Sequence, residues 1–241
     1  GGRYAVLIVG IESSAVAASV AAVEDGRLLG EFYGNTKQTH SQTLLPMAEN
    51  LLRTLGRKPA ECDGLAVSHG PGSFTGVRIG IACVKGLAFP NQTPCVGIST
   101  LEAIAFGGVA CEGAIACAVM DARCGQVYNA LFQVENGRLT RLCPDRALSI
   151  AQLEEECRPW GNRLLLLGDG AELCYRSFQE WGARLAPEAM RFQRAASVAL
   201  LGEQKVLQGC TVTPDALNPV YLRLPQAERE LKKRQEKGAG L

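Results

Sequence analysis

The sequence predicts an α/β fold of two lobes, with mixed sheets flanked by helices, in which a βββαβα order of elements occurs twice. Short apolar runs typical of buried strands alternate with segments of helical period. Asp25-Gly26 and Asn136-Gly137 are strong hairpin signals, and they fall at equivalent points of the two units. The units share little recognisable sequence, so the duplication shows only in the order of elements.

The first unit contains the clearest amphipathic helix, over residues 41–55, which ends before Gly56. Its apolar stripe consists of Leu44, Leu45, Ala48, Leu51, Leu52 and Leu55. The unit is predicted to contain strands at 4–11, 16–23, 27–33, 65–67 and 93–98, and helices at 41–55, 76–89 and 100–106.

The second unit begins with a strand at 114–120, and a hairpin follows it. Further strands are expected at 126–134, 138–143 and 164–167, and helices at 149–157, 170–180 and 195–208. The predicted organisation is an N-terminal lobe over 3–106, a C-terminal lobe over 107–194, a helix and strand over 195–225 that pack back near the N-terminal lobe, and a charged, disordered tail over 226–241.

Composition limits the class of protein. A chain of 241 residues that is 47% hydrophobic can bury a large core, and its net charge of +1 argues against a nucleic-acid footprint of its own. No apolar run approaches the length of a membrane span, and no leader peptide is recognised. The ten cysteines lie singly in apolar segments without a CxxC pair, which predicts reduced thiols in a cytoplasmic protein and no zinc site.

A glycine-rich loop at Gly70, Gly72, Ser73 and Gly76 joins a buried strand to a helix with Thr75 as the expected N-cap. Such a loop can present backbone N–H groups to a phosphate, although no Walker A Gly-Lys-Ser/Thr follows it. Gly76, Gly80 and Cys83 leave one face of the helix nearly without side chains. That face predicts a close neighbour, either within the chain or on a second protein.

Several motifs closely resemble those of the bacterial TsaB family. The most specific is Gly70-Pro71-Gly72-Ser73-Phe74-Thr75-Gly76, preceded by a match over 40–46 and followed by matches at 78–80, 85–88, 99–103, 121–123 with Val127-Tyr128, and 219–223. They occur in the family's order and span about residues 5–223. This resemblance implies the two-lobed actin-like ATPase fold, which agrees with the duplicated order of elements.

The resemblance also implies a function. TsaB proteins are non-catalytic partners of the TsaD-type enzyme, in a complex with a TsaE-type ATPase that forms threonylcarbamoyl-adenosine at position 37 of tRNAs reading codons that begin with A. It implies contact with tRNA only through the complex, a homodimer when the chain is alone, no membrane and no cofactor. TsaB and TsaD pair through two helices from each chain, which places the interface here at Leu44, Leu45, Ala48, Leu51, Leu52, Gly76, Gly80, Cys83 and Leu87.

Departures from catalytic patterns agree with that reading. His40 is followed four residues later by Leu44, so the paired histidines of the TsaD metal site are absent, and a helix-capping role is expected for His40. In the second phosphate loop Arg123 would occupy phosphate space, and an ion pair with Asp121 or another carboxylate is expected. Gly168-Asp169-Gly170 fits either an adenosine contact or a strand-to-helix turn.

Two other functions stay open at this stage. One is an ATP-binding phosphotransferase of the same superfamily, and the other is a glycoprotease-like peptidase, for which no GxSxG, Cys–His or HExxH signal is present. Two residues also depart from the family. Glu12 stands in the first hairpin where TsaB proteins more often have Asp, and Gln42 stands where they usually have Glu.

Overall fold

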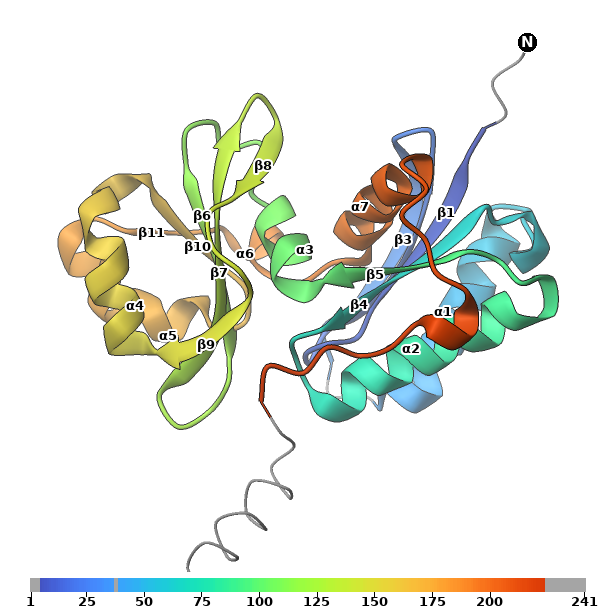
Figure 1. The fold of residues 1–241 in the computed structure, drawn as a ribbon, viewed down its shortest axis with the longest axis horizontal. Coiled ribbons are helices and arrows are strands. Elements are labelled where there is room, and N and C mark those ends of the chain that lie inside the picture. The colour runs from blue at the N-terminus through green and yellow to red at the C-terminus, as the bar shows by residue number, and fades with distance from the viewer. Residues whose placement is uncertain (1–4, 37–38, 224–241) are drawn as a thin grey trace, which may run out of the picture.

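The computed structural model describes residues 5–36 and 39–223 and confirms the two-lobed α/β fold (Figure 1). The first unit follows the predicted order, with most ends shifted by one to three residues. Its elements are β1 (Leu7–Glu12), β2 (Ala18–Glu24), β3 (Arg27–Gly34), α1 (His40–Thr54), β4 (Gly64–Gly70), α2 (Phe74–Ala88), β5 (Cys95–Ser99) and α3 (Thr100–Phe106).

The second unit repeats that order with small additions. Its elements are β6 (Ile115–Asp121), β7 (Gln126–Glu135), β8 (Arg138–Arg141), β9 (Arg146–Ser149), α4 (Ile150–Cys157), β10 (Leu164–Leu167), α5 (Ala171–Phe178), β11 (Arg184–Leu185), α6 (Glu188–Arg191) and α7 (Ala195–Leu207). The sequence did not predict β9, β11 or α6. Each has four residues or fewer, which is too short for a periodic pattern to be visible.

The two sheets have the same strand order. The first runs β3-β2-β1-β4-β5 and the second runs β8-β7-β6-β10-β11, with β9 also paired to β7. In each sheet the central strand has an antiparallel neighbour from the opening hairpin and, on its other side, a parallel neighbour from later in the same unit. The repeat therefore extends to a fifth strand beyond the predicted βββαβα order.

Each sheet has helices on both faces. One face of the first sheet packs Val9, Ile11 and Val67 against α1 and α2, while the other packs Ile8 and Ala66 against α7. The second sheet packs against α3 on one face and against α4 and α5 on the other. The central strands are apolar on both faces because both faces are covered.

The last helix of each unit crosses to the sheet of the other unit. Leu101 and Ile104 of α3 belong to the core of the second sheet, and α3 lies between the lobes in Figure 1. In turn Val198 and Ala199 of α7 pack on the first sheet. The two lobes are thus joined by exchanged helices as well as by the chain itself.

Some expected details differ. Helix α2 is capped by Ser73, whose Oγ accepts the Gly76 N–H at 3.2 Å, rather than by Thr75. In place of a strand within 208–223 there is one isolated bridge between Val212 and Cys95. The predicted tail over 226–241 lies outside the described residues. Among the described helices, none has the length and apolarity required to cross a membrane.

The contact of α7 with β1 leaves no room for a side chain at Gly10. A Cβ there would lie 2.6 Å from the Ala199 nitrogen and 2.8 Å from the Ala195 carbonyl oxygen, both of which are backbone atoms. We expect Gly10→Ala to destabilise the protein by about 1–3 kcal/mol because the helix must move outward. Thermal unfolding measures this effect. Gly34→Ala is the matched control because no described atom lies within 4 Å of its added Cβ. Equal midpoints for the two variants would contradict the close packing.

Candidate partner interface and interlobe cleft

The turn after β1 lies directly on the start of α2. Ser13 Oγ donates to the Gly76 carbonyl oxygen at 2.9 Å, and the Ser73 N–H donates to the Ser14 carbonyl oxygen at 2.7 Å. A Cβ on Gly72 would approach the Ser14 carbonyl oxygen to 2.7 Å. The glycine loop is therefore shaped by the chain's own first hairpin.

Gly76 and Gly80 of α2 face this same turn. A Cβ added to Gly76 would overlap the Ser13 carbonyl oxygen, and one on Gly80 would lie 2.5 Å from Ser13 Oγ and 3.2 Å from a Val67 methyl. The sequence-based hypothesis that Gly76 and Gly80 admit a helix of a second protein is corrected by these contacts. The close neighbour is the protein's own turn and strand β4.

The predicted interface residues divide between two sides of the α1–α2 pair. The inner side, packed on the first sheet, contains Leu44, Ala48, Leu51, Leu52, Gly76 and Gly80, all of which are buried. Three others remain accessible. Leu45 is 44% exposed, and Cys83 and Leu87 are half-buried. The structure thus removes the six inner residues from any direct contact with a partner.

An outer α1–α2 face is formed by Leu45, Glu49, Ile79, Ala82, Cys83 and Gly86. Ala82 and Gly86 are exposed, and no described atom lies within 4 Å of a Cβ built on Gly86. Burial, followed by the nearby carboxylate of Glu49, raises the pKa of the Cys83 thiol to about 11, so the two helices share this surface.

Sequence reasoning missed Glu49, Ile79, Ala82 and Gly86. The positions of Val77, Ile81 and Val84 could have identified the outer side, because these branched residues mark the opposite, buried side of α2.

A cavity of about 430 Å³ lies between the lobes. The first hairpin and the glycine loop line one side through Ser14, Gly72 and Phe74, and Asp121 and Asp169 line the other. The segment 220–223 closes one edge, where Tyr221 stacks on Phe74 with ring centroids 5.0 Å apart. This is the position of the two phosphate loops expected from the sequence.

The second of these loops contains the predicted ion pair. Arg123 Nη1 lies 3.2 Å from Asp121 Oδ2, and the Arg123 N–H donates to Asp121 Oδ1 at 2.7 Å. Arg123, Cys124 and Gly125 all have positive φ, a backbone state that costs a non-glycine residue about 1–2 kcal/mol. The Asp121 carboxylate is thereby bound to its own loop.

Gly168 and Gly170 allow the turn between β10 and α5 to pass close to the backbone of β6. A Cβ on Gly168, where φ is +103°, would overlap the Val119 carbonyl oxygen, and one on Gly170 would lie 2.8 Å from the backbone of Met120. Their close approach to β6 explains both glycines without a nucleotide. Between them Asp169 accepts a hydrogen bond of 2.7 Å from Gln193 Nε2.

Glu12 is a fully buried acid at the end of β1. Its carboxyl group accepts hydrogen bonds from the Ser14 N–H at 2.7 Å and from the hydroxyls of Ser14 and Ser68. Burial raises the pKa of Glu12, the three hydrogen bonds oppose that shift, and the charge of Asp169 across the cleft adds to it. Burial likewise raises the pKa of Asp169. Two acids therefore face the same interlobe region in environments that disfavour their charged forms.

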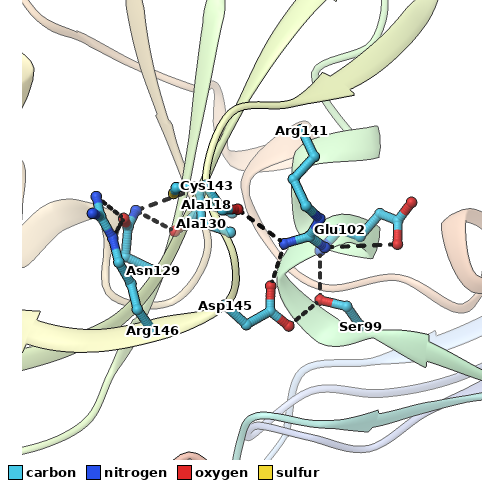
Figure 2. A network of polar contacts seen from close by, with 9 residues as sticks. All are labelled: Ser99, Glu102, Ala118, Asn129, Ala130, Arg141, Cys143, Asp145 and Arg146. Carbon is cyan, nitrogen blue, oxygen red and sulfur yellow. Dashed lines mark hydrogen bonds and ion pairs between the residues drawn. The ribbon is translucent and has the colours of Figure 1, made fainter.

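A polar network links the lobes at the start of α3 (Figure 2). Ser99, at the end of β5, donates to Asp145 at 2.6 Å, and Arg141 Nη1 donates to the same carboxylate at 2.6 Å. Arg141 also lies 3.8 Å from Glu102 of α3 and stacks over the Phe132 ring. These contacts tie the first β-sheet to the loop between β8 and β9.

The two histidines have separate environments. His40 is the first residue of α1, and its Nε2 lies 2.6 Å from the Ala15 carbonyl oxygen, so it contacts the hairpin instead of capping the helix as expected. Within 5–36 and 39–223, no three His, Cys, Asp or Glu side chains are grouped as metal ligands. His69, near the end of β4, lines a separate cavity and not the interlobe cleft.

Comparison with known proteins identifies the family. A family model described as "TsaD: tRNA N6-adenosine threonylcarbamoyltransferase" matches residues 31–231. The chain is 31% identical to the tRNA threonylcarbamoyladenosine biosynthesis protein TsaB of Bacillus subtilis, covering 92% of this chain and 96% of the relative. It is 33% identical to TsaB of Escherichia coli, covering 93% and 97%. The chain belongs to the TsaB family.

Solved structures agree with this assignment. A Pseudomonas aeruginosa protein described as similar to peptidase YEAZ superposes with a TM-score of 0.76 at 30% identity, over 90% of this chain and all of that one. YeaZ from the same organism gives a TM-score of 0.73 at 28% identity over the same shares. These comparisons confirm the family that the sequence motifs predicted, which is the TsaB or YeaZ-type family.

Glu12 provides a test of the cleft electrostatics. Because the pKa of Glu12 is raised above 4.5 in the folded protein, its contribution to stability is present at low pH and is lost as the pH rises through the folded pKa. Glu12→Gln mimics the protonated acid. We expect it to raise the thermal midpoint at pH 8 by about 2–4 °C, the shift that about 1 kcal/mol produces in a domain of this size.

That gain should shrink as the pH falls toward 4.5, the unperturbed value. Glu155→Gln, an exposed acid on α4, is the control and should change the midpoint little at either pH. A lower midpoint for Glu12→Gln at pH 8 would show that the hydrogen bonds outweigh the cost of burying the charge.

The cysteines provide a second test. All ten are free; Cys124 and Cys210 are exposed, and Cys62, Cys95, Cys117, Cys157 and Cys174 are buried. Burial raises the pKa of Cys62 and Cys174 to about 12, which suppresses the reactive thiolate. We expect a maleimide to label Cys124 and Cys210 within minutes and the buried five only after denaturation. Peptide mass spectrometry distinguishes the sites, and early labelling of Cys117 would contradict the packing.

Proposed function

We propose that this protein acts in the biosynthesis of threonylcarbamoyl-adenosine in tRNA as the non-catalytic subunit that binds and activates a TsaD-type enzyme through its outer α1–α2 face. The pathway follows from the names of its TsaB relatives. The chain is also similar to part of an enzyme named for the same modification. A tRNA N6-adenosine threonylcarbamoyltransferase of Syntrophus aciditrophicus is 32% identical over 112 residues, which are 40% of this chain and 33% of that one.

The observation that carries the proposal is the small, apolar outer side of α2. Ala82 and Gly86 lie one turn apart on an exposed face of α2. Leu45 of α1 is 44% exposed, and Phe89, which directly follows α2, is 62% exposed. Small residues on adjacent helices allow a second helix pair to approach closely. Burying this surface would remove apolar area from water.

Three features support a subunit without its own turnover. The Asp121 carboxylate forms an ion pair with Arg123, and His40 is hydrogen-bonded to the Ala15 carbonyl oxygen. The backbone of β6 fills the space beside Gly168 and Gly170. In the assembly that we propose, a TsaE-type ATPase supplies nucleotide hydrolysis and tRNA is reached only through the complex. The same face would form a homodimer when TsaD is absent, and the protein would work in the cytoplasm without a membrane contact.

The interlobe cavity of about 430 Å³ favours one other function, an ATP-binding phosphotransferase. A nucleotide titration separates the two, because a phosphotransferase must bind ATP in this cavity while a partner subunit need not. The Pseudomonas protein is described as similar to a peptidase. The described residues give no support for a peptidase activity here, since they contain no cluster of metal ligands.

The interface is tested by placing a charge at its centre. We expect Ala82→Arg to weaken binding to the TsaD-type subunit of the same organism at least tenfold, because a long charged side chain would be desolvated where the partner helices must approach closely. Ala151→Arg is the matched control, since Ala151 is also an exposed alanine on a helix but lies on α4 of the other lobe. Isothermal titration calorimetry gives both affinities, and unfolding midpoints verify that both variants are folded.

Gly80→Leu tests the inner side of α2, which packs within the chain. Its side chain would meet Ser13 and Val67 of the same chain, so it should lower the unfolding midpoint. Equal affinities for Ala82→Arg and Ala151→Arg would contradict the proposed interface.

A further inference from the structure

A second cavity, of about 490 Å³, lies away from the interlobe cleft and from the outer α1–α2 face. Its walls come from the end of β4, from β5, from the last turn of α7 and from the segment 210–220 that runs back along the first sheet. The Val220 N–H donates to the His69 carbonyl oxygen at 2.7 Å, and Val212 pairs with Cys95. These backbone bonds hold the segment over the cavity. Its volume is within the range of small-molecule sites.

The polar lining is cationic or hydrogen-bonding. Lys205 makes no ion pair with the residues that the structure describes, and no acidic residue is among those that line the cavity. Gln208, which directly follows α7, and the imidazole of His69 line the same space. An unpaired ammonium beside an imidazole and an amide is a suitable environment for an anion.

The C-terminal end of α7 repels an anion less than a free helix end would, because its last carbonyl groups are hydrogen-bonded. The Lys205 carbonyl oxygen accepts the Cys210 N–H at 2.8 Å, and the Val206 carbonyl oxygen accepts the Gly209 N–H at 3.0 Å. These partners reduce the partial negative charge that a C-terminus otherwise presents. The positive charge of Lys205 further compensates it.

The remaining wall is apolar. Val96 of β5, together with Leu217 and Val220 of the covering segment, lines the cavity. We propose that this cavity binds a compact organic anion, a carboxylate or phosphate monoester with a small apolar body, whose charged group contacts Lys205, Gln208 and His69 while its body lies against Val96, Leu217 and Val220. This site is independent of the proposed partner role, because none of these residues belongs to the outer α1–α2 face.

The chain contains only two histidines, which makes the site directly observable. Burial, and then the charge of Lys205, lower the pKa of His69, whereas Asp145 opposes the shift. An anion bound beside the ring would favour the imidazolium and raise that pKa. His40 lies in a separate place, bonded to Ala15, and serves as an internal reference.

The test follows both imidazole signals by NMR while phenyl phosphate, benzoate or inorganic phosphate is added at constant ionic strength. His69→Gln assigns the two signals. We expect a saturable shift and a raised pKa for His69 with phenyl phosphate or benzoate, a much smaller change for His40, and tighter binding of phenyl phosphate than of inorganic phosphate. The stronger of the two organic probes identifies the preferred charged group.

Lys205→Gln should weaken this binding at least tenfold, while Lys58→Gln, at an exposed lysine elsewhere, should leave it unchanged. A His69 shift that grows linearly with anion concentration, or that is equal in the two lysine variants, would overturn the site. Equal affinity for inorganic phosphate and phenyl phosphate would overturn the organic part of the proposal.

Discussion

The turn at Ser13 and Ser14 lies against the start of α2, and this contact determines which side of the helix faces solvent. Gly76 and Gly80 are required there because the Ser13 backbone and hydroxyl occupy the space of their side chains. Once that side is turned inward, Val77, Ile81 and Val84 complete the packing on the first sheet. Ala82 and Gly86 are then directed outward, and no described atom lies within 4 Å of a Cβ built on Gly86. The candidate interface is thus a consequence of an internal packing constraint.

The same turn also shapes the cleft. The Ser14 N–H binds Glu12, and the Ser14 carbonyl oxygen accepts the Ser73 N–H, so the hairpin, the buried acid and the glycine loop form one connected unit. Across the cleft, Asp121 and Arg123 neutralise each other and the Gly168–Gly170 turn packs on β6. The exchanged helices α3 and α7, with the Arg141 network, join the lobes. The two lobes thus enclose a cleft whose polar groups form hydrogen bonds and an ion pair with one another.

The sequence predicted the framework well because its signals are local. The turns at Asp25-Gly26 and Asn136-Gly137, the apolar strands and the stripe of α1 each depend on neighbouring residues, and together they determine the duplicated order. The strands β9 and β11 were missed because each is four residues or fewer and is defined by its pairing with another strand, and helix α6 is a single turn. The orientation of α2 was also missed. Helical spacing shows that Gly76 and Gly80 share a side, but only the fold shows that Ser13 fills it.

The central claim is that the outer side of α1 and α2, and not the glycine side, contacts the partner. Hydroxyl-radical footprinting of the protein alone and in complex with the TsaD-type subunit tests it directly. Leu45, on the outer α1–α2 face, is 44% exposed and Phe89, directly after α2, is 62% exposed, whereas Leu142 and Leu207 are 43% and 63% exposed elsewhere. We expect oxidation of Leu45 and Phe89 to fall several-fold in the complex while oxidation of Leu142 and Leu207 is unchanged. Protection of Leu142 or Leu207, with Leu45 and Phe89 still oxidised at the free rate, would contradict it.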